Sequence, residues 1–373
     1  MTRVARQHGA INLAQGFPDF PAPEGIKEAA VRALRADVNQ YAVTWGAPEL
    51  RQAIAGFMAK RRGVEVDPET QITVCCGATE AMMAAMLGVL DPGDEVLIPE
   101  PFYENYGPDG VISGAVPVFV PMGPGFRLDI EAMEKAITAK TRAVVFNTPH
   151  NPTGRVFQKQ ETEALYDLIR RHDLLLFTDE IYEEILYTGR HQSPLLEPGM
   201  AERTLAISGA SKTFSVTGWR VGWVISPPAL TSGVRKVHDF LTVGAPAPLQ
   251  QAVAEALHWD DDYFEPMRRE YQQRRDLLVA GLQQSGFACE SPEGAYYVMA
   301  DCRPFQRHGE NDVDFALRLI RECGVATVPG SSFYQNPEDG AGMIRFCYAK
   351  RVQTLEEAVE KLQAWIQTPS ASC

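Results

Sequence analysis

The sequence lacks a hydrophobic run long enough to cross a membrane. Its longest apolar stretch, AMMAAMLGVL at residues 81–90, is about half of the ~20 residues that a membrane-spanning helix needs. The opening stretch, MTRVARQHGAINLAQGF, has no apolar core of signal-peptide length. We therefore expect a soluble, cytoplasmic protein with no membrane partner.

Positive charge is also scarce. The 35 Lys and Arg residues are outnumbered by 48 Asp and Glu residues, which leaves a formal net charge of −13 at pH 7. This balance argues against nucleic acid as a partner, because a phosphate backbone attracts a cationic surface. It is still compatible with a small anionic ligand held by a few local cations.

Paired cysteines and nucleotide-binding loops are missing as well. The seven cysteines are odd in number, show no C-x₂-C pair and mostly lie in apolar stretches, so we expect reduced, buried thiols and no metal site. No segment matches the G-K-[ST] of a Walker A loop or a G-x-G-x-x-G, which argues against a nucleotide-binding site. The cysteines are Cys75, Cys76, Cys289, Cys302, Cys323, Cys347 and Cys373.

What the chain does contain is a long alternation of short apolar runs with helical patterns, which predicts an α/β fold with a mainly parallel sheet between helices. A charged helix is expected at 261–284, followed by a smaller α+β unit. Because 373 residues exceed the size of one hydrophobic core, we predict a large domain at 40–270. Residues 1–39 and 271–373 form the small domain, whose irregular N-terminal arm wraps onto the rest.

Several unusual polar residues fall where predicted strands end, which is where doubly wound sheets bind ligands. After QITVCC, Gly77 permits a tight turn and Ala78 and Thr79 open a helix, whose free N–H groups suit a phosphate. The simpler alternative is an ordinary strand-to-helix turn capped by Thr79.

The next strand ends carry an amide, an acid and two cations. Asn151 lies in NTPHNPTG, and in LLLFTDEIYEEI Asp179 ends an apolar strand, with Tyr182 three residues later. The segment SGASKTFSVTGWRVGW then supplies Lys212 and Arg220. Taken singly, these residues also fit a turn, a cap and solvated loop charges; their order on successive strand ends favours a ligand site.

Pyridoxal 5′-phosphate would use the whole set. Its aldehyde needs a lysine amine, its ring nitrogen a carboxylate, its phenolic oxygen hydrogen-bond donors, and its phosphate a helix N-terminus and an arginine. Around these residues, NQYAVTWGAPELRQAIA, GATEA, NTPHNPTG, DEIYEEI, SKTFSVTGWRVGW and IRFCYAK resemble the class I/II aminotransferases of fold type I. The opening INLAQGFPDF resembles the kynurenine, glutamine and methionine aminotransferase branch.

The resemblance implies a role for each matching residue. Lys212 would bind the aldehyde, Asp179 the pyridine nitrogen, and Asn151 and Tyr182 the phenolic oxygen, while Tyr103 would stack on the ring. The phosphate contacts would come from Gly77, Ala78, Thr79 and Arg220, with Tyr41 reaching the phosphate of a neighbouring subunit in a homodimer. Arg345 would bind the substrate carboxylate, which Gly16 would approach through its backbone. Relatives usually place a phosphate-binding serine where this chain has Gly209, so Ser208 or Ser211 would substitute.

The resemblance also implies an activity, with alternatives. We expect a pyridoxal-phosphate-dependent aminotransferase that works by a ping-pong mechanism on a neutral donor such as methionine, glutamine or an aromatic amino acid. The segment DFLTVGAPAPLQQ, expected to cross the dimer interface, contains no cation for a distal carboxylate, and Phe17 would add an aromatic wall. The alternatives are a cysteine-S-conjugate β-lyase on the same scaffold and a non-catalytic, cofactor-binding regulatory domain.

Overall fold

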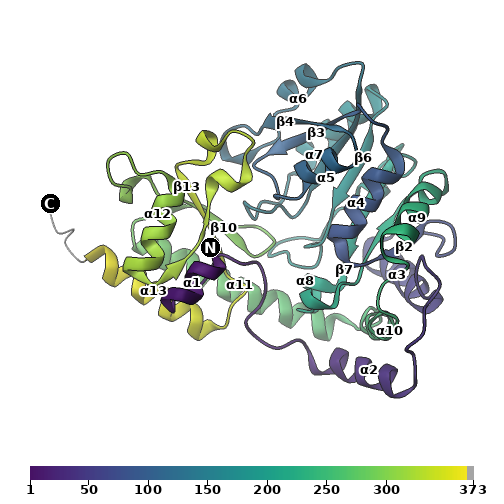
Figure 1. Ribbon diagram of the computed structural model, residues 1–373, viewed down its shortest axis with the longest axis horizontal. Helices are drawn as coiled ribbons and strands as arrows, with labels where there is room; N and C mark the ends of the chain where they lie inside the picture. The colour runs from purple at the N-terminus through teal and green to yellow at the C-terminus, as the bar shows by residue number, and fades with distance from the viewer. Residues whose placement is uncertain (368–373) are drawn as a thin grey trace.

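A seven-stranded sheet forms the centre of the computed structural model, which describes residues 1–367 (Figure 1). Its strand order is β2-β8-β7-β6-β5-β3-β4. Strand β8 runs opposite to the other six strands, which all point the same way. The predicted α/β fold with a mainly parallel sheet is therefore confirmed. The strands are β2 (Ile72–Cys75), β3 (Glu95–Glu100), β4 (Val116–Pro121), β5 (Thr141–Asn147), β6 (Leu175–Asp179), β7 (Thr204–Gly209) and β8 (Gly222–Ile225).

Helices cover both faces of this sheet because its strands are apolar on both sides. Along β3, Val96 and Ile98 pack into the core beneath α4, whereas Leu97 packs into the opposite core beneath α7. The large-sheet helices are α3 (Pro48–Arg62), α4 (Gly77–Val89), α5 (Tyr106–Ile112), α6 (Ile130–Ala136), α7 (Lys159–Arg171), α8 (Ala210–Thr213), α9 (Pro228–Thr242) and α10 (Ala247–Ala256).

The C-terminal third of the chain builds a second, smaller sheet of order β12-β13-β10-β9, in which all neighbours are antiparallel. A two-residue parallel pair joins β1 to β11 beside it. The elements are β1 (Ile11–Asn12), β9 (Ala288–Cys289), β10 (Tyr297–Asp301), β11 (Val325–Ala326), β12 (Val328–Pro329), β13 (Met343–Cys347), α12 (Asp312–Arg318) and α13 (Val352–Gln367).

Helix α11 (Asp261–Gln284) connects the two cores and has the bounds predicted from the sequence. Phe264, near its start, belongs to the core around α3 and α10, whereas Leu278 and Leu282 belong to the core of the smaller sheet. The predicted boundary at residue 270 thus falls inside one continuous helix. The division into 40–270 and the flanking segments stays a prediction.

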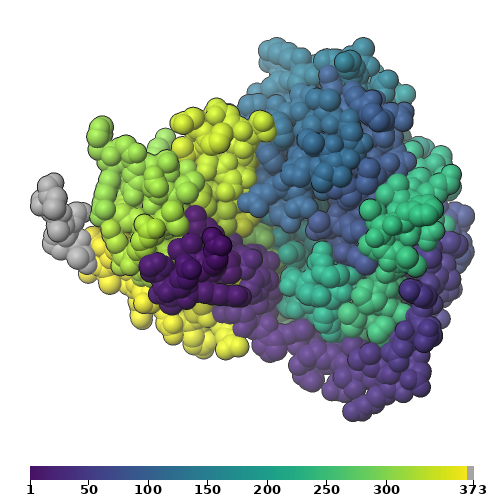
Figure 2. Space-filling model, in the orientation of Figure 1, coloured from purple at the N-terminus to yellow at the C-terminus, as the bar shows by residue number. Residues whose placement is uncertain are grey.

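The N-terminal segment has more regular structure than its prolines suggested. It contains α1 (Thr2–His8) and α2 (Glu24–Arg35), and Figure 2 shows its first part lying against the C-terminal third of the chain. There Ala5 packs in a small core with Ile320 and Ala326. Farther along, α2 packs beside α10. The arm therefore spans both parts of the molecule.

Two expectations about chemistry can be compared with the structure. The six cysteines within residues 1–367 are free thiols; four are buried as expected, whereas Cys76 and Cys289 are half-buried, and Cys373 lies outside the described residues. Over the same residues, no helix is both long and apolar enough to cross a membrane.

Candidate functional site

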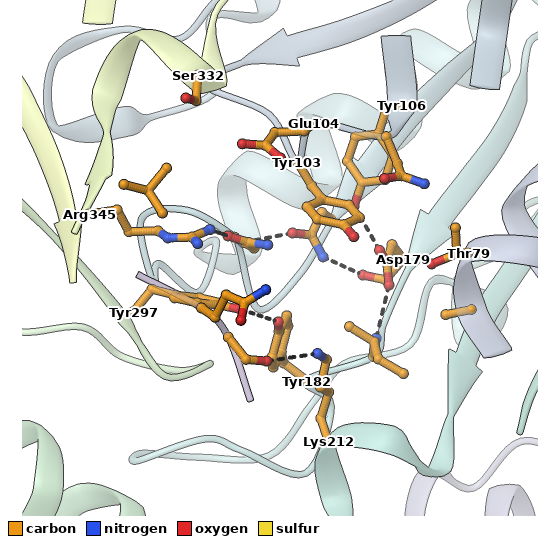
Figure 3. A pocket seen from close by; sticks show the side chains of 18 of the residues that line it. Thr79, Tyr103, Glu104, Tyr106, Asp179, Tyr182, Lys212, Tyr297, Ser332 and Arg345 are labelled. Carbon is orange, nitrogen blue, oxygen red and sulfur yellow. Dashed lines mark hydrogen bonds between the residues drawn. The ribbon is translucent and has the colours of Figure 1, made fainter. Parts of the chain in front are cut away.

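A cavity of about 620 Å³ lies at the carboxyl ends of the parallel strands, between the large sheet and the smaller one (Figure 3). It collects side chains from segments far apart in the sequence. Most residues predicted for the site line it: Gly16, Ala78, Thr79, Tyr103, Asn151, Asp179, Tyr182, Ser211, Lys212, Arg220 and Arg345. The order of polar residues on strand ends was thus a sound guide to a common location.

Asp179 ends β6 and is a buried acid of the cavity. One carboxylate oxygen accepts a hydrogen bond from the Tyr106 hydroxyl at 2.8 Å, and the other accepts one from the Ile181 backbone N–H at 3.2 Å. Burial raises the pKa of Asp179, while these two hydrogen bonds and the charge of Lys212 oppose the rise. The carboxylate is therefore held in one orientation and lacks an ion-pair partner in direct contact.

Lys212 lies on α8, the single helical turn that follows β7. Its Nζ donates to the Gly16 carbonyl at 3.2 Å and lies 5.8 Å from the ring centres of Tyr182 and Tyr296. Desolvation lowers the pKa of Lys212 to about 8, and the positive charges of Arg220 and Arg345 act in the same direction. A fraction of this amine is therefore unprotonated near neutral pH, as a nucleophile or base requires.

Arg345 projects from β13 and meets Asn151 across the cavity. Its guanidinium donates to the Asn151 side-chain oxygen at 2.7 Å and to the Ala14 carbonyl at 3.0 Å. The Tyr297 ring lies 4.2 Å from the guanidinium carbon, whereas the buried Nε has no hydrogen-bond partner. Because arginine only donates, it fixes which side-chain atom of Asn151 accepts, and the amide N–H groups remain available to a ligand.

The start of α4 and Arg220 form the anion-binding side of the cavity. A Cβ on Gly77, whose φ is +82°, would lie 2.6 Å from the Arg220 guanidinium, and a Cβ on Gly222 would lie 2.6 Å from the Ala78 backbone nitrogen. Arg220 itself has a left-handed backbone, with φ of 55°. Two glycines and a strained arginine thus bring a cation beside free helix N–H groups, an arrangement that suits phosphate.

Tyr182 and Gly16 both lie against Tyr297, a residue that the sequence analysis did not single out. The Tyr182 hydroxyl shares a 2.9 Å hydrogen bond with the Tyr297 hydroxyl. A Cβ on Gly16 would lie 1.8 Å from that same Tyr297 oxygen. Only glycine therefore lets the N-terminal segment pass this close to the tyrosine pair.

Four predicted site residues do not line this cavity. Gly77 packs against the Arg220 guanidinium, and the Ser208 hydroxyl donates to Glu183 at 2.6 Å. The Phe17 ring packs 4.7 Å from the Lys350 Nζ, and Tyr41 is 87 % exposed on the surface. Of the two serines proposed to replace the one missing at Gly209, the structure therefore brings only Ser211 to the cavity.

Tight packing at Gly209 leaves no room for the serine that the resemblance implies at this position. A Cβ at this position would lie 2.9 Å from the Gly222 Cα and 2.9 Å from the Val221 carbonyl oxygen. Both atoms belong to the backbone of the adjacent strand segment, which cannot move aside as a flexible side chain would. A serine there would require the β7–β8 pair to separate.

Sequence reasoning also missed several lining residues. Tyr106 holds Asp179, and Asn147 donates to the Asp179 backbone carbonyl at 2.8 Å while accepting from the Asn151 backbone N–H at 2.7 Å. Asp109 lines the cavity one helical turn after Tyr106. Tyr106 had a signal in FYENY, three residues after Tyr103, whereas the orientation of Asp109 could not be read from the chain.

The donor set of the cavity fits a ligand that carries an aldehyde, a basic ring nitrogen and a phosphate. Lys212 offers a partly neutral amine, Asp179 a fixed carboxylate, and Arg220 with the α4 terminus an anion cradle. The unpaired Nε of Arg345 leaves a cation able to accept a second anion.

Comparisons with known proteins agree with this chemistry. The sequence model of the family Aminotransferase class I and II matches residues 8–362. The chain is 40 % identical to a probable N-succinyldiaminopimelate aminotransferase of Mycobacterium tuberculosis, covering 99 % of this chain and 96 % of the relative. It is 36 % identical to a methionine aminotransferase of Escherichia coli, covering 97 % and 94 %. The solved structure of the Mycobacterium tuberculosis N-succinyldiaminopimelate aminotransferase superposes with a TM-score of 0.94 at 41 % identity, covering 98 % and 96 %.

Proposed function

Because the chain belongs to the class I and II aminotransferases, which are pyridoxal-phosphate-dependent enzymes, we propose which amino acids it uses and which residues act on them. The proposed reaction moves the amino group of a neutral L-amino acid, such as methionine, glutamine or an aromatic amino acid, to a 2-keto acid in two half-reactions. The observation that carries this proposal is one cavity in which Lys212, Asp179 and Arg345 converge.

The residues proposed to hold the cofactor follow from the donor set. When bound, pyridoxal phosphate supplies an aldehyde that condenses with amines and a ring that accepts electrons from the substrate. Lys212 holds it covalently, Asp179 keeps its ring nitrogen protonated, and Asn151 and Tyr182 donate to its phenolic oxygen. Tyr103 covers the ring. Ala78, Thr79, Ser211 and Arg220 bind the phosphate.

Arg345 and Lys212 are proposed to handle the substrate. The Arg345 guanidinium binds the α-carboxylate, with Gly16 approaching through its backbone, so that the substrate Cα–H bond is oriented toward the Lys212 side of the cavity. With the substrate amine in its place on the cofactor, the Lys212 amine would be free to take the proton from Cα. The lowered pKa of Lys212 supports this assignment, because a base must be unprotonated before it acts.

The proposed class of amino donor depends on which cationic side chains line the cavity. Among the described lining residues, only Lys212, Arg220 and Arg345 have cationic side chains, and each already has a proposed task. A distal carboxylate would enter this cavity without a partner from its own chain, which costs several kcal/mol when the charge is desolvated. A neutral side chain meets no such cost. A location in the cytoplasm, where the free thiols of the chain stay reduced, fits this metabolic role.

A second donor class is favoured by one comparison. The relative that is 40 % identical over nearly the whole chain is named for N-succinyldiaminopimelate, whose distal end carries carboxylates. If a partner subunit supplies a cation to the cavity, such a donor would be accommodated here too.

The proposed donor class is tested by a panel of donors with a common 2-keto acid acceptor. We expect kcat/KM for methionine, glutamine or phenylalanine to exceed that for aspartate by at least tenfold, because of the unpaired distal carboxylate. N-succinyldiaminopimelate belongs in the same panel. If it or aspartate gives the highest kcat/KM, the proposed neutral donor is wrong while the aminotransferase chemistry stands. With a cysteine S-conjugate as the only substrate, formation of pyruvate and ammonia together with the released thiol, without any keto-acid acceptor, would instead reveal β-lyase activity.

A further inference from the structure

Asp109 is a buried acid of the cavity to which the mechanism above gives no task. It lies on α5, is 3 % exposed and lines the same cavity as Lys212 and Asp179. Its Oδ2 is buried without a hydrogen-bond partner. A buried carboxyl without a partner is costly, so this group calls for a ligand on the side that faces the cavity.

The position of Asp109 relates it to Asp179. Tyr106, one helical turn earlier on α5, donates to the Asp179 carboxylate, so the same helix face that holds Asp179 also carries Asp109. Desolvation, and to a smaller extent the negative charge of Asp179, together raise the pKa of Asp109 to about 7. Two neighbouring carboxyls without a cation between them resist being ionised together.

The other groups around Asp109 do not neutralise it. Tyr103, before α5, and Tyr106, on α5, are phenols whose pKa values are raised by burial. From α4, Thr79 and Met82 line the cavity without charge, and the cations Lys212 and Arg220 line it from other segments. Asp179 is the charged group that acts on Asp109 in this part of the cavity.

We propose that Asp109 is a second acid at the pyridine end of the cofactor site. Its negative charge, added to that of Asp179, stabilises a protonated pyridine ring. This inference rests on the proposed role of Asp179. Without cofactor, Asp109 is protonated below neutral pH, because a second negative charge would face Asp179. A protonated ring nitrogen supplies the missing cation, so Asp109 releases its proton to solvent when the cofactor is held, and each event favours the other.

Asp109 is a positioning residue in this scheme, since it acts through the charge beside Asp179 and not on the substrate. The contribution of Asp109 to cofactor binding increases as pH rises. At pH 5.5 Asp109 carries its proton and adds no charge. Above its pKa of about 7 it is ionised and strengthens the hold on the cofactor.

The test compares cofactor release from holoenzyme for the wild type, Asp109→Asn and a matched control, Glu104→Gln. Glu104 is an exposed carboxylate that lines the same cavity. The released cofactor is captured by an excess of another cofactor-binding protein. The rate of release is measured from the loss of the visible band of the lysine-bound cofactor. We expect Asp109→Asn to release cofactor at the wild-type rate at pH 5.5 and about tenfold faster at pH 8.5. Glu104→Gln should follow the wild type at both values.

Two results would overturn the inference. One is a ratio of Asp109→Asn to wild-type release rates that is the same at both pH values, because that indicates a pH-independent packing effect. The other is a similar pH-dependent ratio in Glu104→Gln, because that indicates a general surface-charge effect. Asp109→Ser provides the same comparison if the Asn variant does not fold. A wild-type protein without the visible band would instead contradict the proposed function, so the two failures are distinguishable.

Discussion

At the scale of single residues, the site is built from groups whose surroundings oppose their usual ionisation. Burial raises the pKa of Asp179 and lowers that of Lys212, so the acid and the amine both move toward neutrality. A lysine that served only as a surface charge would gain nothing from such a position. The pair is therefore arranged for a ligand that supplies the complementary charge.

The prediction at the residue scale concerns Lys212→Ala. Without the amine, the cofactor has no covalent attachment and the substrate Cα–H has no nearby base, so we expect the visible band of the lysine-bound cofactor to disappear. Transamination should fall by a factor on the order of 10⁴ or more. Absorption spectra and single-turnover rates measure both. An unchanged spectrum in the variant would mean that Lys212 is not the attachment site.

At the scale of elements, a buried ion pair ties the first turn of α4 to α9. The His238 Nδ1 lies 3.0 and 3.1 Å from the two Glu80 carboxylate oxygens, and its Nε2 lies 2.9 Å from the Thr44 carbonyl oxygen. The carbonyl and the carboxylate only accept, and the Thr242 hydroxyl, 3.3 Å from Nδ1, is able to accept as well, so these contacts favour a proton on both ring nitrogens and a cationic imidazole. Burial alone lowers the pKa of His238, but Glu80, the Thr44 carbonyl and Asp239 outweigh it and raise the net value.

This pair predicts a pH dependence of stability with a definite sign. A histidine whose pKa is raised in the folded state stabilises fully below its unfolded pKa of about 6.5, and the contribution is lost as pH rises through the folded pKa. We expect His238→Gln to lower the free energy of unfolding by about 1.5 to 3 kcal/mol at pH 6. The deficit should shrink at pH 9.

Urea unfolding of the holoenzyme at several pH values measures this difference. His308→Gln is a suitable control, since His308 is exposed, and it should leave the midpoint unchanged at every pH. A deficit of the same size from pH 6 to pH 9 would show that His238 is held neutral, contrary to its two acceptor partners.

The elements also show which parts of the fold could be predicted. The alternation of apolar runs was enough for the sheet and α11, because burial of strands on both faces leaves a clear pattern. The short α1 and α2 were missed since Pro18, Pro21 and Pro23 dominated the segment between them. The residues predicted at strand ends were chosen for their chemistry, and the structure brings most of them to one cavity, while their roles stay predictions. Tyr297 and Asp109 were not, because their roles depend on a close approach of distant segments.

At the scale of the whole molecule, the exposed apolar side chains point to a second copy of the chain. Phe240 is 91 % exposed at the end of α9, and Tyr41, Leu241 and Val243 are also exposed. We propose that this surface joins two subunits in a homodimer and carries Tyr41 to the phosphate site of the partner. Phe240, Leu241 and Val243 lie together at the end of α9, and an apolar patch, unlike a single exposed side chain, marks an interaction surface.

The dimer is tested by Phe240→Asp. A charge in the centre of an apolar interface is unpaired and costs several kcal/mol, so sedimentation velocity should show a shift from dimer toward monomer at micromolar concentration. Cofactor affinity should fall in parallel if Tyr41 serves the partner's site. Leu196→Asp, at an exposed leucine on a separate segment, controls for the added charge. Wild-type sedimentation of Phe240→Asp would place the interface elsewhere.

The backbone of residues 14–17 has a consequence for the thermodynamics of substrate capture. Each of its four carbonyls already accepts a hydrogen bond: Arg345 donates to Ala14, Lys350 to Gln15 and Phe17, and Lys212 and Tyr296 to Gly16. A loop that was loose before binding would lose conformational entropy with every turnover, at about 1–2 kcal/mol for each residue ordered. Here that ordering takes place once, when the chain folds. The free energy of substrate binding is then left for orienting the Cα–H bond.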